Sequence, residues 1–338
     1  MNENNLNVDL SIIIPFYKRD NFILDILNGL DNENIRLGLS IEVIFVDSNS
    51  STNIDEIINS YLPTSKLDIK KIDTFNSASH KRNFGIKNAK SNNIISIDDD
   101  CITGDNFISI HYKSLKEKET RVINSGIVNF SKNSYRNSNY YRYRNERHRI
   151  YDKIYFKDEE ISFYNIVTMN MSFKKDELTS ENLLFDEDYT FYGLEDTQFG
   201  LDCIKKGFKL KTCLAPIIHQ EDTSINKFLK KNKDFTENFL KFYKKNVDSL
   251  SSNKSLSINN ENIAGIKYLH FLIRIYLFVK YKYVLQLLRV LSFMLVPFEF
   301  ILKFFLIKTD SKKIFYFFKL YKILTIIIIV KTLFGKIR

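Results

Sequence analysis

Three consecutive aspartates, Asp98 to Asp100, directly follow the short apolar run 93–97. Adjacent carboxylates repel one another, so this arrangement needs a compensating positive charge. A divalent cation with an anionic ligand supplies it, and hard oxygen donors suit Mg²⁺ or Mn²⁺. If the chain stays extended here, Asp98 and Asp100 share one side and form the better pair for a metal bound to a diphosphate. The alternative is a solvated acidic turn.

Two further positions could work beside such a metal–diphosphate. Glu195 and Asp196 stand at the start of a predicted helix that ends at Gly207, where one of them could act as a general base. The alternative is an acidic first turn that the helix dipole stabilises. His219 follows the predicted strand 208–214 and Pro216. We expect it to be a third metal ligand, and the alternative is a purely structural histidine.

The elements that position these residues follow from the apolar pattern. Buried strands are predicted over 10–14, 41–46, 67–72 and 93–97, and helices over 21–30, 53–62 and 77–89. Strands that alternate with helices indicate a parallel sheet, whose ligands bind beyond the carboxyl ends of the strands. Asp47, the basic run 80–82 and the three aspartates all follow strands at that edge.

Charge is distributed unevenly along the chain of 338 residues, whose net charge is +10. Residues 262–338 contain 14 basic and 2 acidic side chains, and this segment is also rich in Leu, Ile and Phe. Basic patches that bind nucleic acid are rarely so apolar, whereas elements at membrane surfaces often are. We therefore expect no nucleic-acid partner.

The chain is expected to contain two structured parts. Residues 1–248 form the catalytic domain, 249–262 a polar linker, and 263–338 a helical segment. The favoured interpretation of 263–338 is amphipathic helices on an anionic membrane surface. The alternatives are a helical subdomain that packs on protein and a single span over about 290–307, which Glu299 and Lys303 disfavour.

Seven short motifs occur in an order that resembles family 2 glycosyltransferases. They are PFY at 15–17, VDSNS at 46–50, RNFG at 82–85, IDDD at 97–100, NMSFK at 170–174, FDE at 185–187 and GLED at 193–196. The resemblance covers roughly residues 8–225. The last motif, followed by His219, resembles the galactosyltransferase-type C-terminal half of this superfamily. The implied fold is GT-A: a Rossmann-like, mostly parallel α/β sheet flanked by helices.

The resemblance also implies roles for single residues. Asp196 would be the catalytic base, and Glu195 would bind sugar hydroxyls. Asp98, Asp100 and His219 would hold Mn²⁺ or Mg²⁺. The nucleotide sugar would contact Pro15, Tyr17, Asp47, Ser48, Arg82, Asp98 and Asp99. Ser48 stands where many relatives have a second aspartate, which weakens the expectation of a uracil base.

The function that the resemblance implies is inverting, metal-dependent sugar transfer. The donor would be a nucleotide sugar, expected to be a UDP-sugar, and the acceptor a glycan or lipid-linked glycan of bacterial surface polysaccharide synthesis. The enzyme would lie at the inner face of the cytoplasmic membrane. Two alternatives are a nucleotidyltransferase on a similar sheet, which the absence of glycine from residues 15–19 disfavours, and an inactive membrane scaffold.

Overall fold

The computed structural model describes residues 8–51, 53–131, 138–144, 160–190, 192–220, 224–252, 282–309 and 318–335. The chain divides into two compact units. The first comprises Met1–Ser131, Asn145–Thr190 and Glu195–Glu221, and the second Lys132–Arg144, Phe191–Leu194 and Asp222–Arg338. Each unit has its own cluster of buried apolar side chains.

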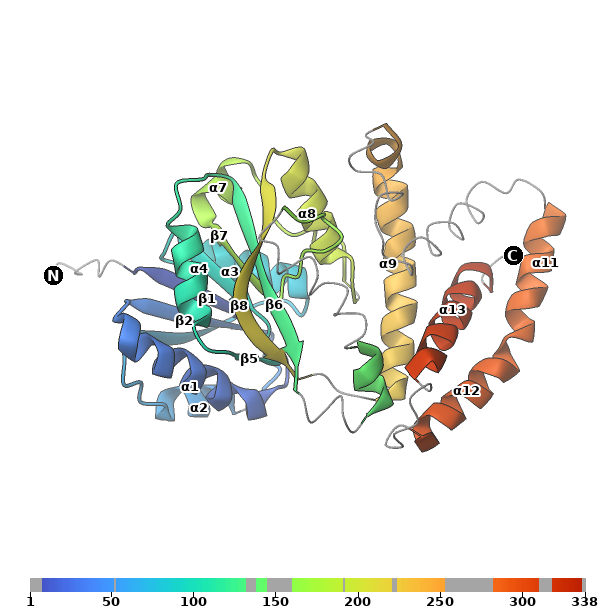
Figure 1. The fold of residues 1–338 in the computed structure, drawn as a ribbon, viewed down its shortest axis with the longest axis horizontal. Helices are drawn as coiled ribbons and strands as arrows, with labels where there is room; N and C mark the ends of the chain where they lie inside the picture. The colour runs from blue at the N-terminus through green and yellow to red at the C-terminus, as the bar shows by residue number, and fades with distance from the viewer. Residues whose placement is uncertain are drawn as a thin grey trace. The chain divides into compact units, whose positions relative to one another are not determined.

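Strands and helices alternate at the start of the first unit, as the sequence predicts (Figure 1). These elements are β1 (Leu10–Pro15), α1 (Asp20–Leu37), β2 (Ile41–Asp47), α2 (Ile54–Ser60), β3 (Leu67–Asp73), α3 (Ala78–Asn88) and β4 (Asn93–Ile97). Helix α1 runs seven residues beyond its predicted end and stops at Gly38, whose φ of 66° is left-handed. Ser77 caps α3 by accepting a hydrogen bond from the His80 amide.

The second half of this unit completes the sheet. It contains β5 (Cys101–Thr103), α4 (Phe107–Leu115), β6 (Val122–Phe130), β7 (Asn170–Lys174), α7 (Lys175–Ser180), α8 (Glu195–Lys205) and β8 (Lys209–His219). The eight strands follow the order β3-β2-β1-β4-β7-β6-β8-β5. Neighbours pair in parallel at β3/β2, β2/β1, β1/β4 and β6/β8, and antiparallel at β4/β7, β7/β6 and β8/β5. The expected α/β fold with a mostly parallel sheet is therefore confirmed.

Both faces of the central strands are buried, which explains their unbroken apolar sequence. Ile12 and Ile14 of β1 belong to the buried cluster that includes residues of α1 and α4. Ile13 points to the other face, where a Cβ added to Gly85 of α3 would lie 2.4 Å from its Cγ2 atom. The glycine in the RNFG motif thus lets α3 pack closely on β1, and α3 carries Arg82 toward the carboxyl edge of the sheet.

Strand β8 is longer than the sequence pattern predicts. The predicted strand 208–214 becomes Lys209–His219, so His219 is the last residue of the strand rather than a residue beyond it. Pro216 lies inside β8 and pairs with Ile127 of β6, directly after the register between the two strands shifts. Because the hydrogen-bond ladder is irregular there, a proline without an amide hydrogen is tolerated. This extension places His219 opposite Cys101, directly after the three aspartates.

The second unit is helical in the residues that the structure describes. It contains α9 (Ile225–Ser252), α11 (Lys282–Met294), α12 (Val296–Thr309) and α13 (Phe318–Phe334). Its buried cluster joins Phe228 of α9, Leu306 of α12 and Leu324 of α13. Residues 249–252 of the predicted linker continue α9, and the rest of the linker lies outside the described residues. The segment Gln286–Thr309 is long and apolar enough to cross a bilayer, and only 11% of its most apolar window is buried.

Candidate active site

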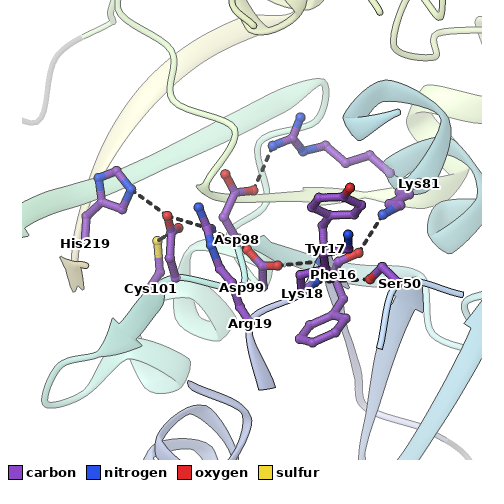
Figure 2. Close-up of polar contacts among 12 residues, drawn as sticks. Phe16, Tyr17, Lys18, Arg19, Ser50, Lys81, Asp98, Asp99, Cys101 and His219 are labelled. Carbon is purple, nitrogen blue, oxygen red and sulfur yellow. Dashed lines mark hydrogen bonds and ion pairs between the residues drawn. The ribbon is translucent and has the colours of Figure 1, made fainter. Parts of the chain in front are cut away.

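The three aspartates form a turn rather than a continued strand. Strand β4 ends at Ile97, and the amide of Cys101 donates to the carbonyl of Asp98 at 3.1 Å. The extended geometry that would pair Asp98 with Asp100 on one side therefore does not persist. Instead, the Asp98 carboxylate meets Arg82 of α3 at 2.7 Å, whereas Asp99 and Asp100 meet Arg19 (Figure 2).

Arg19 is a site residue that the sequence interpretation missed. It follows β1, and its Nη1 atom lies 2.6 Å from Asp99 Oδ1 and 2.6 Å from Asp100 Oδ2. Burial lowers the pKa of Arg19, but the two carboxylates outweigh this and raise it above its ordinary value. Burial also raises the pKa of Asp99 to about 7, although Arg19 acts to lower it. Its position after a strand, at the edge that holds Asp98 to Asp100, is the signal that could have revealed Arg19.

His219 and Asp100, two of the predicted metal ligands, lie in direct contact. The His219 Nε2 atom lies 3.0 Å from Asp100 Oδ2, and both side chains are about 6% exposed. The Nδ1 atom of His219 is buried and has no hydrogen-bond partner in the described part of the chain. Figure 2 shows His219 approaching the aspartate turn from the end of β8 and Arg19 approaching it from the loop after β1.

The donor chemistry of this cluster fits a divalent cation. Carboxylate oxygens with one imidazole suit Mn²⁺ or Mg²⁺, and the unpartnered Nδ1 atom leaves the imidazole of His219 a further bond to make. Within the described ranges, no three His, Cys, Asp or Glu side chains already converge as a metal site. The reason is visible in the contacts of Arg19, because its guanidinium takes the position between Asp99 and Asp100.

A second charged network joins α3 to α8. Arg82 is 3% exposed and lies between Asp98, at 2.7 Å, and Glu195 Oε1, at 3.8 Å from its Nη1 atom. The Nε and Nη1 atoms of Arg82 and the Oε2 atom of Glu195 are buried without a hydrogen-bond partner among the described residues. Buried polar atoms are normally satisfied, so these atoms indicate a place for a polar ligand.

The acidic pair at the start of α8 lies where the sequence predicts. Asp196 Oδ1 accepts the amide hydrogen of Thr197 at 2.7 Å, an interaction that the helix N-terminus favours. Burial raises the pKa of both Glu195 and Asp196; the charge of Asp196 raises that of Glu195 further, and Arg82 opposes the rise for both. A carboxylate with a raised pKa accepts a proton more readily than an exposed carboxylate does.

The predicted nucleotide-contacting residues lie around the end of β1 and β2. Asp47 accepts two hydrogen bonds from Ser50, from its amide at 3.0 Å and its hydroxyl at 2.5 Å, and so shapes the loop after β2. The hydroxyl of Ser48 is buried and has no described partner. Tyr17 is 45% exposed, and its amide donates to Asp99 Oδ2 at 2.6 Å, whereas Pro15 is a buried strand residue.

Lys81 was part of the basic run and proves to be buried. Its ammonium group donates to the carbonyl of Phe16 at 2.5 Å and lies 5.2 Å from the centre of the Tyr17 ring (Figure 2). Burial lowers the pKa of Lys81, while Asp47 and Asp99 act to raise it. Lys81 therefore ties the loop after β1 to α3, and it adds positive charge near Tyr17 and Asp47.

The charged groups at the carboxyl edge of the sheet are suited to bind a polar, anionic molecule and to take a proton from it. Arginine and lysine side chains supply positive charge, the aspartate turn and His219 supply cation ligands, and Glu195 and Asp196 supply proton acceptors. All of these groups belong to the first unit. Arg82 contacts Asp98 and Glu195, so the aspartate turn and the start of α8 face the same buried guanidinium.

Solved structures of other proteins share this fold. The chain superposes on the mannosyltransferase PcManGT of Pyrobaculum calidifontis, in complex with GDP-Man and Mn²⁺, with a TM-score of 0.58 and 13% identity, covering 98% of this chain and 88% of that one. It also superposes on TarS residues 1–349 of S. aureus, in complex with UDP-GlcNAc, with a TM-score of 0.54 and 15% identity, covering 96% and 90%.

Sequence comparison points to the same family. The chain is 24% identical over 135 residues to the glycosyltransferase GlyG of Streptococcus pneumoniae serotype 4, a match that spans 40% of this chain and 43% of that protein. Residues 11–178, which include β1 to β7 and the aspartate turn, match the family described as Glycosyl transferase family 2. Fold, motif order and family match agree, and the chain belongs to glycosyltransferase family 2 with a GT-A-like catalytic fold.

Proposed function

We propose that the chain is an inverting, metal-dependent glycosyltransferase that uses a nucleotide sugar, with a UDP-sugar as the expected donor. The observation that carries the proposal is the buried Arg82 between Asp98 and Glu195, with polar atoms left unpartnered on both Arg82 and Glu195. A diphosphate and a sugar carry the acceptors and hydroxyls that such atoms require. The nucleotide sugars bound by PcManGT and TarS support this class of donor.

In this proposal the carboxyl edge of the sheet holds the donor. Tyr17, Asp47 and Ser48 border the nucleoside, and Arg82 contacts the diphosphate. Asp98, Asp100 and His219 would hold Mn²⁺ or Mg²⁺, which would supply positive charge to the leaving diphosphate. In this proposal the cation would replace the contact of Arg19 with Asp100, and the Arg19 side chain is 38% exposed.

Asp196 is proposed as the base. Its carboxylate takes the proton of an acceptor hydroxyl while that oxygen attacks the anomeric carbon opposite the diphosphate. The new carbon–oxygen bond forms as the bond to the diphosphate breaks, and the diphosphate leaves with the electron pair, which inverts the configuration. Glu195 orients sugar hydroxyls, and its contact with Arg82 holds it near the donor.

The first test combines donor binding with loss of the base. Thermal unfolding is followed with UDP-GlcNAc, UDP-galactose, UDP-glucose and GDP-mannose, with and without Mn²⁺, because a bound donor stabilises the fold by about 2.7 kcal/mol at a hundred times its Kd. We expect Asp196→Asn to keep the stabilisation and to lose release of UDP or GDP. Wild-type release in that variant, together with an inactive Glu195→Gln variant, means that the base is misassigned.

We further propose that the second unit binds the inner surface of the cytoplasmic membrane, where a lipid-linked glycan acceptor of surface polysaccharide synthesis lies. Helix α12 exposes large apolar side chains outside the stripe that packs on its own unit, including Phe300, 72% exposed, and Phe304, 55% exposed. The cations of Arg289 and Lys308 lie over neighbouring phenylalanine rings. Basic groups beside exposed aromatics suit the interface of an anionic bilayer.

Vesicle flotation tests the membrane proposal with the full chain. The double variant Phe300→Glu, Phe304→Glu should stay with the soluble fraction when vesicles of phosphatidylcholine and phosphatidylglycerol float. The matched control is Leu62→Glu, since Leu62 is 87% exposed in the first unit. If the double variant floats as fully as the wild type does, α12 is not the membrane-binding element.

A further inference from the structure

A bulge in β8 decides which residue of this strand reaches the aspartate turn. Ser125 of β6 pairs with Thr212 of β8. Two residues further along β6, Ile127 pairs with Pro216, so β8 has advanced by four residues over the same distance. With the earlier register continued, a residue two positions before His219 would face the last residue of β6. The two extra residues of the bulge therefore set the position of His219.

The side-chain amide of Asn170, the first residue of β7, spans this bulge. Its Nδ2 atom donates to the carbonyl of Ile127 on β6 at 3.0 Å and to the carbonyl of Ala215 on β8 at 2.9 Å. A bulge interrupts the ladder of backbone hydrogen bonds, and here one amide supplies a donor to each strand. Asn170 is fully buried, so water cannot replace these two bonds freely.

The contacts on both sides of the amide assign its orientation. The Oδ1 atom of Asn170 lies 2.8 Å from Nε2 of His111, and because a carbonyl oxygen only accepts, the Nδ2 atom faces the two strands. A Cβ atom on Gly126 would lie 2.3 Å from this Nδ2 atom. Gly126 does not have a positive φ, so the glycine serves to admit the amide rather than to permit an unusual backbone.

Asn170 also touches the strand that carries the aspartate turn. Its backbone pairs with Ile97, the last residue of β4, and the carbonyl of the residue before it accepts the amide hydrogen of Asp98 at 3.3 Å. Beyond the bulge, the amide of the residue that follows His219 donates to the carbonyl of Asp100 at 2.8 Å. One residue thus contacts both the strand that leads to the turn and the strand that leads to His219.

We propose that Asn170 is a positioning residue for the cation site, which places His219 against Asp100 by holding the bulge of β8. This inference rests on the proposed function, in which these two side chains would hold the cation. Their Nε2 and Oδ2 atoms lie 3.0 Å apart. Loss of the two extra residues from the register would move His219 by about 6–7 Å along the strand, which exceeds the reach of Asp100.

The test compares Asn170→Ala with the matched control Ser172→Ala. Ser172 is fully buried two residues along β7, and its hydroxyl contacts His111 at 2.9 Å but no carbonyl of β6 or β8 in the described structure. Calorimetry with Mn²⁺ alone should show about 10-fold weaker binding in Asn170→Ala and binding within about twofold of the wild type in Ser172→Ala. Gly126→Ala displaces the amide without removing it and should weaken binding about threefold.

Hydrogen–deuterium exchange gives a second readout that needs neither metal nor activity. The amide of Gln220 donates to the carbonyl of Asp100, so its exchange reports whether the end of β8 stays in place, while the amides of β1 report global unfolding. Relative to β1, Gln220 should exchange about 10-fold faster in Asn170→Ala and at the wild-type rate in Ser172→Ala. If Asn170→Ala does not fold, Gly126→Ala serves for the same comparison.

Two results would overturn the positioning role. One is unchanged exchange of Gln220 in Asn170→Ala, and the other is faster exchange together with wild-type affinity for Mn²⁺. If the wild type itself binds no Mn²⁺, the proposed metal dependence fails. The exchange comparison then still decides whether Asn170 places His219 beside Asp100.

Discussion

Two buried histidines, one at the end of β8 and one packed against that strand, differ in what surrounds them. His111 of α4 is fully buried, and both of its ring nitrogens meet neutral partners: Nδ1 lies 2.9 Å from Ser172 Oγ, and Nε2 lies 2.8 Å from Asn170 Oδ1. The thiol of Cys213 lies 3.5 Å from Nδ1. Burial lowers the pKa of His111 to about 4, so the ring is neutral and its interactions are complete within the fold.

His219 is almost as deeply buried, but its surroundings are charged and incomplete. One nitrogen meets Asp100, whose carboxylate also binds Arg19, and the other nitrogen has no partner in the described residues. Burial alone therefore does not show whether the fold completes the interactions of a histidine. The two histidines differ in whether the fold provides a hydrogen-bond partner for each ring nitrogen. Substitutions around the two rings test that difference.

Asp100→Asn should have the largest effect, on activity. It removes one charge from the proposed cation-binding cluster while keeping the shape of the side chain, and we expect nucleotide-sugar hydrolysis with Mn²⁺ to fall ~1000-fold, about 4 kcal/mol. The control is Ser172→Ala beside His111, which should keep full activity per folded molecule. Retention of a tenth of the wild-type rate in Asp100→Asn contradicts the proposed role of Asp100.

His111→Leu should have the second-largest effect, on stability. It leaves Asn170 Oδ1 and Ser172 Oγ buried without the ring, and we expect the free energy of unfolding in urea to fall by about 3 kcal/mol. Activity of the folded fraction should be unchanged. A large loss of kcat at unchanged stability means that His111 acts in the reaction and that the contrast with His219 is wrong.

His219→Gln should reduce activity with little cost in stability. Glutamine keeps a polar group near Asp100 but removes the imidazole, and we expect hydrolysis with Mn²⁺ to fall ~10- to 100-fold. Urea unfolding should change by less than about 1 kcal/mol because the site is already incomplete. Loss of stability as large as in His111→Leu, with normal turnover, indicates a structural histidine.

Acid should destabilise the fold through His111. Its pKa is about 4 in the fold and near 6.5 when exposed, so the unfolded chain binds the extra proton first as the pH falls. The contribution of neutral His111 to the free energy of unfolding is complete above pH 6.5. It decreases by about 1.4 kcal/mol per pH unit below that pH and is lost near pH 4. Urea unfolding at pH 7 and pH 5.5 should show this decrease in the wild type and a smaller one in His111→Leu; equal slopes contradict it.

Arg19→Gln should have the smallest effect, and the quantity that it should change is the affinity for Mn²⁺. Removing the guanidinium frees Asp99 and Asp100, so we expect calorimetry to show Mn²⁺ binding about threefold tighter, less than 1 kcal/mol. The control is Lys18→Gln, which alters a neighbouring cation without contact to the aspartates in the described structure. Weaker Mn²⁺ binding in Arg19→Gln indicates that the arginine assists the cation rather than opposing it.

Local patterns predicted much of the first unit. The runs that became β1, β2 and β4 are apolar and β-branched because both of their faces are buried, and this composition is legible without knowing the partners. The sequence analysis predicted neither strand β6 nor helix α4. Polar Asn124 and Ser125 interrupt β6, and they are buried among neighbours that only the folded sheet supplies.

The candidate site was predictable in its residue types and less so in its geometry. The acidic pair at the start of α8 and the aspartates after β4 lie where their local signals place them. The pairing of Asp98 with Asp100 assumed an extended chain, and the turn at Cys101 redirected Asp98 to Arg82. The one signal for Arg19 is its position after β1, because the carboxylates that it contacts lie about 80 positions away in the sequence.

The sequence by itself determined the α/β alternation, the acidic edge of the sheet and the basic, apolar character of the C-terminal segment, since these depend on residue type and short-range spacing. Only the tertiary structure decided which carboxylate meets which cation and which histidine is satisfied. These outcomes depend on distances between atoms that are far apart in the chain, and such distances are fixed only when the strands and helices pack.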